Sequence, residues 1–209
     1  MRLSLIRLVV LTSLGLALVG APAAIAAPDW RVTPDDMVLG NPKAKVTVIE
    51  YASASCPHCA RFDVEVFPAF KAKYIDSGQV RYVMREFLTP PEEVAAAGFL
   101  VARCGGKAKY FAILDQVFRH QTEIYQTNDL QGVMERAGQT AGLTPAQVDA
   151  CIYDGSALAA LNIRVDTYIK RDEIAGTPTF IINGKPLGAA GEPSLASLDA
   201  AIAAARKGR

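Results

Sequence analysis

The sequence contains little of what several protein classes depend on. Its 209 residues include only four cysteines, two histidines and one tryptophan, and aromatic residues make up 8% of the chain. So few cysteines exclude a small disulfide-dense scaffold. Lysine and arginine (22) nearly balance aspartate and glutamate (21), so no positive excess favours nucleic acid as a partner. The composition also excludes collagen-like, disordered and coiled-coil chains.

A long apolar run occurs only near the N-terminus, and no later stretch approaches the 18 or more apolar residues of a membrane helix. Residues 1–26 combine Arg2 and Arg7 with the apolar segment Leu8–Gly20 and the A-x-A cleavage site Ala24-Ile25-Ala26. This pattern is typical of a cleaved secretory signal peptide. An uncleaved membrane anchor is the alternative, although the run is short for one. We therefore expect a soluble mature protein in an oxidising compartment, where disulfides persist.

The first part of the remaining chain predicts a strand, a helix and a second strand. The strands are expected at 46–51 and 79–87, where β-branched and aromatic residues are frequent. The helix is expected from about 57 to 74, with a kink at Pro68, which cannot donate a helical hydrogen bond. Residues 91–173 differ, since they are rich in alanine and glutamine and apolar at helical spacing.

Within this helical block, breaks at glycine, proline and asparagine delimit the expected helices at 92–103, 107–121, 128–140, 145–152 and 156–172. One apolar stripe on the last of them is predicted to face the core and comprises Leu158, Leu161, Val165 and Tyr168. After the block, strands are expected at 179–182 and 185–189, joined by the hairpin signal Asn183-Gly184. A final helix is predicted at 194–206, with Ser194 as its N-cap.

A Cys-x-x-Cys motif stands where the first strand leads into the first helix. Cys56 would lie at the helix N-terminus, where unpaired N–H groups and the helix dipole stabilise a thiolate and lower its pKa. Pro57 suits the first helical position, and His58 could add a positive charge or a donor. Cys59 would be more buried and could attack a mixed disulfide on Cys56. The alternatives are half of a zinc site, which lacks a second close ligand pair, and a plain structural disulfide.

Two segments together resemble the DsbA family of thiol–disulfide oxidoreductases. They are Val48–Cys59, which contains the cysteine motif, and Gly176–Gly184, which contains Thr177-Pro178 before a strand. The resemblance implies an α/β, thioredoxin-like fold with an inserted α-helical domain. The expected divisions are a signal peptide at 1–26, a thioredoxin-like domain at 27–90 and 174–209, and an inserted helical domain at 91–173.

The resemblance also implies residue roles. Those expected to take part in catalysis are Cys56 as nucleophile, Cys59 as resolving cysteine, Pro57 and His58 as the dipeptide that tunes the redox potential, and Glu50 as a buried acid. Those expected to bind substrate are Thr177 and Pro178, in a loop with a cis peptide bond. Glu50 would assist proton transfer at the resolving cysteine, and burial would raise its pKa. The alternative is an ordinary strand-end acid facing water.

Cys104 and Cys151 form a second pair that the simplest members of the family lack. Both fall in the helical block, and we expect them to form a structural disulfide. The alternative is a second redox relay.

The function implied by the resemblance is that of a periplasmic oxidase. It would donate the Cys56–Cys59 disulfide to reduced exported proteins and be reoxidised by a quinone-linked membrane oxidase of the DsbB type. No cofactor, metal or nucleic acid is expected, and a monomer is favoured. The alternatives are a disulfide isomerase or a reductase, because threonine before the proline also occurs in those enzymes, and a peptide-binding chaperone.

Overall fold

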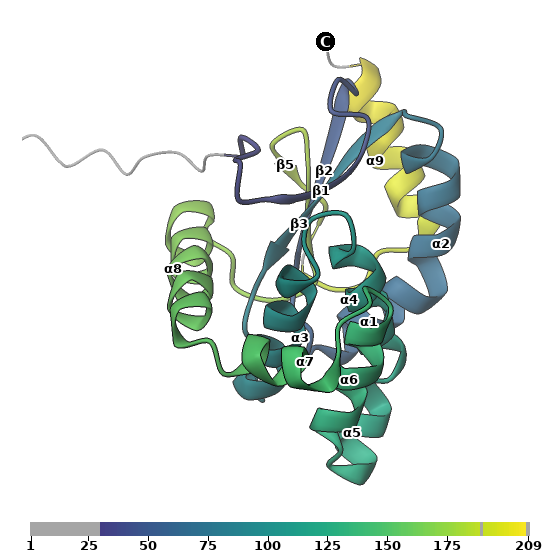
Figure 1. The fold of residues 1–209 in the computed structure, drawn as a ribbon. Helices are drawn as coiled ribbons and strands as arrows, with labels where there is room; N and C mark the ends of the chain where they lie inside the picture. The colour runs from purple at the N-terminus through teal and green to yellow at the C-terminus, as the bar shows by residue number, and fades with distance from the viewer. Residues whose placement is uncertain (1–29, 189, 208–209) are drawn as a thin grey trace, which may run out of the picture.

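The computed structural model describes residues 30–188 and 190–207, and the predicted signal peptide at 1–26 lies outside them. Figure 1 shows a central sheet with α2 and α9 on one side and α8 on the other. The strands are β1 (Met37–Gly40), β2 (Val46–Ala52), β3 (Val80–Glu86), β4 (Thr179–Ile182) and β5 (Lys185–Pro186). The helices outside the inserted block are α1 (Pro57–Arg61), α2 (Phe67–Phe70), α9 (Leu195–Lys207) and the π-helical turns η1 (Phe62–Val66) and η2 (Lys71–Ile75). Those of the block are α3 (Glu92–Cys104), α4 (Tyr110–Arg119), α5 (Gln121–Thr127), α6 (Leu130–Gln139), α7 (Pro145–Ile152) and α8 (Gly155–Asp172).

The sheet has the order β1-β3-β2-β4-β5. β2 and β3 are parallel and are connected through α1 to η2, whereas β4 is antiparallel to β2 and forms a hairpin with β5. The helices α3 to α8 lie in the chain between β3 and β4. This arrangement confirms the α/β class predicted from the sequence.

The alternating side chains of β2 supply two separate apolar clusters, because successive residues of a strand face opposite sides of a sheet. Val48 packs in the larger apolar core, which also contains Phe62 and Phe180. Ile49 and Tyr51 join the other cluster, against which α8 packs. By the same alternation Glu50 falls on the side of Val48, beneath the first helix.

The helix that follows the cysteines is interrupted in two places. The Phe67 N–H donates to Phe62 O, five residues earlier, so the chain forms a π-helical turn just before Pro68. Pro68 lies in the first turn of α2, where its missing N–H costs little. The predicted kink is therefore taken up by η1, and a second π-helical turn precedes the end of the helix at Ile75.

Several expected elements differ from the structure. The edge strand β1, which pairs with β3, was not predicted. The helix expected at 107–121 ends at Arg119, and α5 follows it where a connection was expected. The second hairpin strand, expected at 185–189, ends at Pro186, since Gly188 takes a positive φ of 64° and turns the chain away. In the predicted core stripe of α8, Leu158 is 37% exposed, whereas the other three members are buried.

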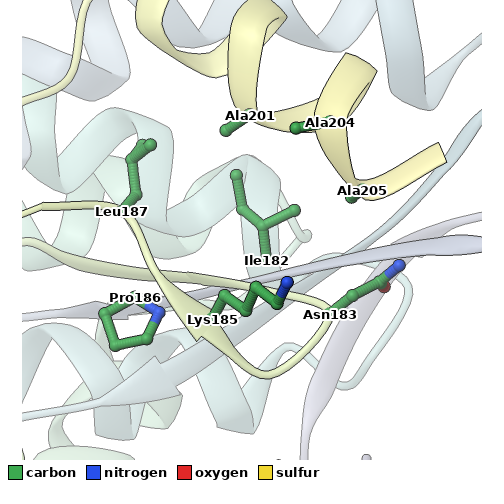
Figure 2. A pocket seen from close by; sticks show the side chains of 8 residues that line it. All are labelled: Ile182, Asn183, Lys185, Pro186, Leu187, Ala201, Ala204 and Ala205. Atoms are coloured by element: carbon green, nitrogen blue, oxygen red, sulfur yellow. The ribbon is translucent and has the colours of Figure 1, made fainter. Parts of the chain in front are cut away.

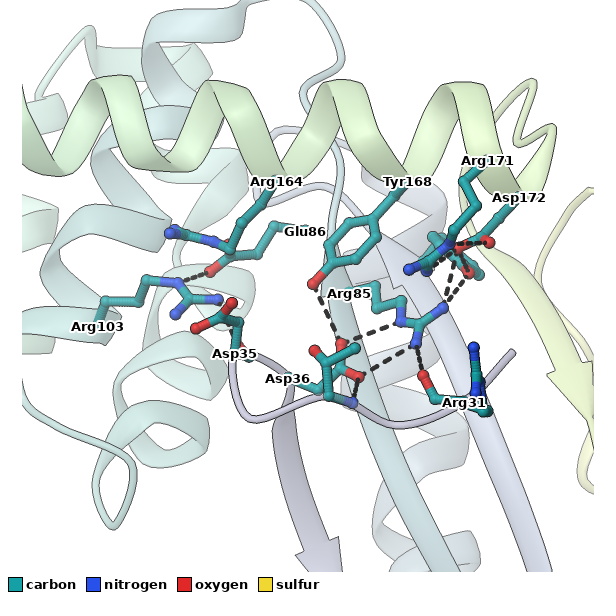
Figure 3. Close-up of polar contacts among 12 residues, drawn as sticks. Arg31, Asp35, Asp36, Arg85, Glu86, Arg103, Arg164, Tyr168, Arg171 and Asp172 are labelled. Carbon is teal, nitrogen blue, oxygen red and sulfur yellow. Dashed lines mark hydrogen bonds and ion pairs between the residues drawn. The ribbon is translucent and has the colours of Figure 1, made fainter. Parts of the chain in front are cut away.

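A buried ionic network attaches α8 and the N-terminal segment to the sheet (Figure 3). Arg85 of β3 is completely buried, and its guanidinium lies 3.0 Å from Asp36 Oδ1 and 2.9 Å from Asp172 Oδ2 at the end of α8. It also donates to Tyr51 Oη (2.7 Å) and to Arg31 O (2.7 Å). Because every nitrogen of this buried cation has an acceptor, the charge is compensated inside the fold.

A cavity of about 410 Å³ lies between the β4–β5 hairpin and α9 (Figure 2). Ile182 and Leu187 line one side, and Ala201, Ala204 and Ala205 of α9 line the other. Neither cysteine of the motif lines it, so it is separate from the site described below. In the part of the chain that the structure describes, no helix combines the length and apolar character of a membrane span.

Candidate active site

The two cysteines of the motif are placed by a turn between β2 and α1. The Cys56 N–H donates to Ser53 O (3.0 Å), which closes the turn, and Cys56 is the N-cap of α1. Pro57 takes the first helical position, and the Ala60 N–H donates to Cys56 O (3.1 Å) as the first helical bond. The strand therefore delivers the first cysteine to the end of a helix where backbone donors are free.

The two thiols have opposite environments. Cys56 is 6% exposed and Cys59 is fully buried, and both are free cysteines. The pKa of Cys56 is lowered to about 5, chiefly because the Cys59 thiol donates a hydrogen bond to its thiolate, with further help from the backbone N–H groups of Cys59 and His58. Burial raises the pKa of Cys59 well above that of an ordinary thiol. At neutral pH the arrangement therefore favours an ionised Cys56 and a protonated Cys59.

The Thr177-Pro178 loop faces the first cysteine. Thr177 O lies 3.5 Å from Cys56 Sγ, and the peptide bond between Thr177 and Pro178 is cis. Pro178 is buried, and its carbonyl accepts a hydrogen bond from the Gly191 N–H (2.9 Å). Residues 121 apart in sequence are thus brought together at one end of the sheet.

Glu50 lies beneath the cysteines and is not a water-facing acid. Its side chain on β2 is 1% exposed, and the Tyr82 hydroxyl donates to Glu50 Oε2. Desolvation raises the pKa of Glu50 to about 8, and the charge of Cys56 contributes in the same direction. At neutral pH the carboxyl group therefore carries a proton, which it could deliver to Cys59.

The side chain of His58 points away from the helix core and is paired at the surface. His58 Nδ1 lies 3.2 Å from Glu192 Oε2, and Arg61 Nε lies 3.5 Å from the same oxygen. Glu192 belongs to the loop that leads into α9, and nothing in the sequence pointed to it. Its carboxylate joins the cysteine helix to the C-terminal part of the fold.

Two further groups at the site also escaped the sequence analysis. Asp63, one turn beyond Cys59, is half-buried, and its pKa is raised to about 7 by desolvation and then by the charge of Asp115. An acid at this spacing on the cysteine helix is a signal that could have been used. The other group is formed by Gln121 and Tyr125 of α5, which contact the turn before Cys56. No sequence pattern indicates such contacts across more than 60 residues.

The second cysteine pair lies on other helices than the first. Cys104, at the end of α3, is disulfide-bonded to Cys151 of α7, with a Cα–Cα distance of 6.1 Å. The bond joins two helices of the inserted block. Among residues 30–188 and 190–207, no three histidine, cysteine or acidic side chains are grouped so that they could hold a metal ion.

Comparisons with known proteins agree with this geometry. A family model described as Thioredoxin matches residues 32–204. Relatives that carry a protein-disulfide oxidoreductase name occur in Rickettsia conorii, with 34% identity over 76% of this chain and 57% of that protein, and in Rickettsia bellii, with 33% identity over 74% and 60%. The chain thus spans less than two thirds of the length of these relatives.

Solved structures show the same fold. The alpha-DsbA1 protein of Wolbachia pipientis matches with a TM-score of 0.75 and 27% identity, over 84% of this chain and 93% of that chain. Oxidised BdbD from Bacillus subtilis matches with a TM-score of 0.73 and 20% identity, over 83% of this chain and 94% of that chain. At this identity the match shows a shared fold only. These matches confirm the thioredoxin-like fold with its helical insertion.

Proposed function

The chain belongs to the DsbA family of thioredoxin-like thiol–disulfide proteins, and from that premise we propose that it is an oxidase that donates its Cys56–Cys59 disulfide to other proteins. The observation that carries the proposal is the asymmetry of the pair, with the pKa of Cys56 near 5 and that of Cys59 raised. At pH 7 the Cys56 thiolate outnumbers its thiol about 100-fold. Stabilising the thiolate stabilises the dithiol form, so the disulfide form becomes a stronger oxidant.

The proposed reaction has two exchange steps. A substrate thiolate attacks Cys56 Sγ, which forms a mixed disulfide and breaks the Cys56–Cys59 bond. Cys59 leaves as a thiolate in a buried position and takes a proton, for which Glu50 is the candidate donor. The second substrate thiolate then attacks the substrate sulfur of the mixed disulfide and releases Cys56 as its stable thiolate. Two substrate thiols are oxidised, and the two electrons remain on the cysteine pair.

The remaining roles follow the same proposal. The loop at Thr177 and Pro178 would bind the extended substrate beside Cys56, since its backbone faces that sulfur. Pro57 and His58 would tune the redox potential from inside the motif. Residues 27–90 with 174–209 would form the thioredoxin-like domain, and 91–173 the inserted domain.

The cellular context is proposed on the same basis. Cleavage of residues 1–26 would release the protein into the periplasm, where reduced exported proteins are its substrates. A quinone-linked membrane oxidase of the DsbB type would reoxidise it, and the protein would act as a monomer.

The function is tested by oxidative folding of a reduced, unfolded ribonuclease. We expect the wild-type disulfide form to oxidise the substrate rapidly and the Cys56→Ser variant to be inactive. The Cys59→Ser variant cannot form the donor disulfide and should be inactive as well. When it is given a disulfide-bonded substrate instead, its Cys56 thiolate should attack that disulfide and accumulate as a mixed disulfide, because the Cys59 thiol that would release it is missing. Full activity of Cys56→Ser would exclude catalysis by this pair and favour the peptide-binding chaperone.

The redox direction is tested by equilibrium with glutathione. An oxidase requires a potential well above the roughly −270 mV of thioredoxin. A thioredoxin-like value would favour a reductase, and reshuffling of scrambled ribonuclease without net oxidation would favour an isomerase.

A further inference from the structure

The short helix α5 holds the turn that leads into the active-site helix. Gln121 Nε2 donates to Ala54 O (2.8 Å) and to Cys56 O (3.3 Å), and the Tyr125 hydroxyl donates to Ser55 O (2.6 Å). Gln121 and Tyr125 are four residues apart, so they lie on the same face of α5. Two side chains of the inserted block therefore bind the carbonyl groups of three successive residues, the last of which is the nucleophile.

These carbonyl groups are buried and need donors. Ala54 and Ser55 are at most 1% exposed, and a buried carbonyl without a partner carries a large desolvation penalty. Cys56 O already accepts the Ala60 N–H, so the Gln121 donor adds a second bond to the N-cap carbonyl of α1. The geometry of the helix start is thus determined jointly by α1 and α5.

Gln121 is itself 3% exposed, an unusual position for an amide side chain. Burying an amide is unfavourable unless it makes hydrogen bonds, and both bonds from its nitrogen go to the cysteine turn. The helix that carries it is anchored by Ile124, which is 4% exposed, and by an ion pair between Glu123 and Arg136 of α6. The inserted block therefore presents the amide from a fixed position.

We propose that Gln121 and Tyr125 are positioning residues for the nucleophile. By holding the carbonyl groups of residues 54–56, they keep Cys56 Sγ against the N–H groups at the start of α1 and so make the Cys56–Cys59 disulfide more oxidising. The inference rests on the proposed function and adds to it that the helical insertion helps to set the redox potential.

Electrostatics gives the direction of the effect. Carbonyl oxygens near a thiolate oppose its charge, and donors that bind those oxygens offset their partial negative charge. Tyr125 is also within electrostatic range of the nucleophile, because the pKa of Tyr125 is raised by burial and then by the charge of Cys56. Removing either donor should destabilise the thiolate, and with it the dithiol form.

Close packing around residues 54–56 restricts the movement of the turn. A Cβ at Gly98 of α3 would lie 2.8 Å from Ala54 Cβ, so α3 approaches the turn as closely as a glycine allows. The turn is thus enclosed by α3 and bound by α5, and it has little room to change its carbonyl directions without those helices moving.

The test uses two substitutions that remove a donor and preserve size, Gln121→Met and Tyr125→Phe. Their matched controls are Gln126→Met, on the exposed side of α5, and Tyr153→Phe, at a tyrosine that is 80% exposed. The readouts are the absorbance of the thiolate at 240 nm against pH, the equilibrium with glutathione, and Tm. We expect each test variant to raise the pKa of Cys56 by roughly 0.5 to 1. We also expect each to lower the equilibrium constant for reduction by glutathione roughly 3- to 10-fold.

The outcomes separate positioning from mere packing. If the test variants lower Tm but leave the pKa of Cys56 and the glutathione constant within twofold of their controls, the proposal is overturned. If Gln121→Met does not fold, Tyr125→Phe decides alone, since it removes one oxygen from a half-exposed side chain. A wild-type protein that shows no redox change with glutathione would instead refute the proposed function, which keeps the two failures distinguishable.

Discussion

Replacing Cys56 by serine should remove a pH-dependent contribution to the stability of the reduced protein. The pKa of this thiol is about 5 in the folded state, against 9.0 for an ordinary thiol in the unfolded chain. Because the folded value is the lower one, its contribution is complete above pH 9 and is lost as the pH falls through 5. Between these limits the free energy of unfolding should rise by about 1.4 kcal/mol per pH unit.

At pH 7 the difference corresponds to about 3 kcal/mol, since this pH lies two units above the folded pKa. We expect a contribution of about 1–3 kcal/mol, with the full shift as the upper limit. Glu50 and Asp63 also titrate near neutral pH, with raised pKa values of about 8 and about 7. Both acids are present in the variant, so their contributions largely cancel when the two proteins are compared.

The assay is urea unfolding of reduced wild-type and Cys56→Ser protein, kept reduced by a phosphine, at pH 5, 6, 7 and 8. The expected result is a stability difference that grows with pH. The oxidised wild-type protein serves as a control, because neither cysteine of the motif can titrate in it. Two stability curves that run parallel from pH 5 to 8 would refute the electrostatic account of the nucleophile.

Three further changes have expected outcomes. Glu50→Gln should raise the free energy of unfolding at pH 7 by about 2–3 kcal/mol, because the wild-type acid has a raised pKa and opposes folding as the pH rises above its ordinary 4.5. It should also slow disulfide exchange, since the amide has no proton to deliver. Urea unfolding and stopped-flow exchange measure the two effects, and unchanged stability would contradict the burial argument. Arg85→Met should cost about 3–5 kcal/mol in urea unfolding, since it leaves the buried Asp36 without its cation and Asp172 paired with Arg171 alone. A loss below 1 kcal/mol would contradict the compensation described here. Replacing both Cys104 and Cys151 by alanine should lower stability by about 2–4 kcal/mol, given their separation of 47 residues, while leaving the glutathione equilibrium within twofold; a larger redox change would instead support a relay.

Local signals in the sequence were sufficient for the first half of the site. The strand at 46–51, the helix start at Pro57 and the cysteine spacing are all short-range features, and they place Cys56 at a helix N-terminus without knowledge of the rest of the fold. The burial of Glu50 was left open by the sequence, which also allowed a strand-end acid facing water; the structure buries it because β2 is covered on both faces.

The parts that could not be predicted depend on long-range packing. The strand β1 has four residues and is recognisable only through its pairing with β3. The seven residues of α5 contain no strong apolar period, and the contacts of Gln121 and Tyr125 with the cysteine turn span 65 to 70 residues of sequence. Leu158 was assigned to the core from its spacing alone, whereas in the structure it is 37% exposed and only the other three members of the stripe are buried.

The charges of Cys56 and Glu50 at neutral pH depend on where β2 and the turn after it place these two residues. At pH 7 Cys56 is ionised and Glu50, with a pKa of about 8, is mostly protonated, so of these two groups only the thiolate near the helix N-terminus is charged. Cys59 is fully buried, so in the proposed reaction its release as a thiolate is costly unless a proton reaches it. An acid whose pKa lies near the working pH is suited to deliver that proton. Such a value requires Glu50 to be desolvated on β2. The pKa of Cys56 is low instead because the turn after β2 places this thiol at the start of α1, beside the Cys59 thiol and the backbone N–H groups.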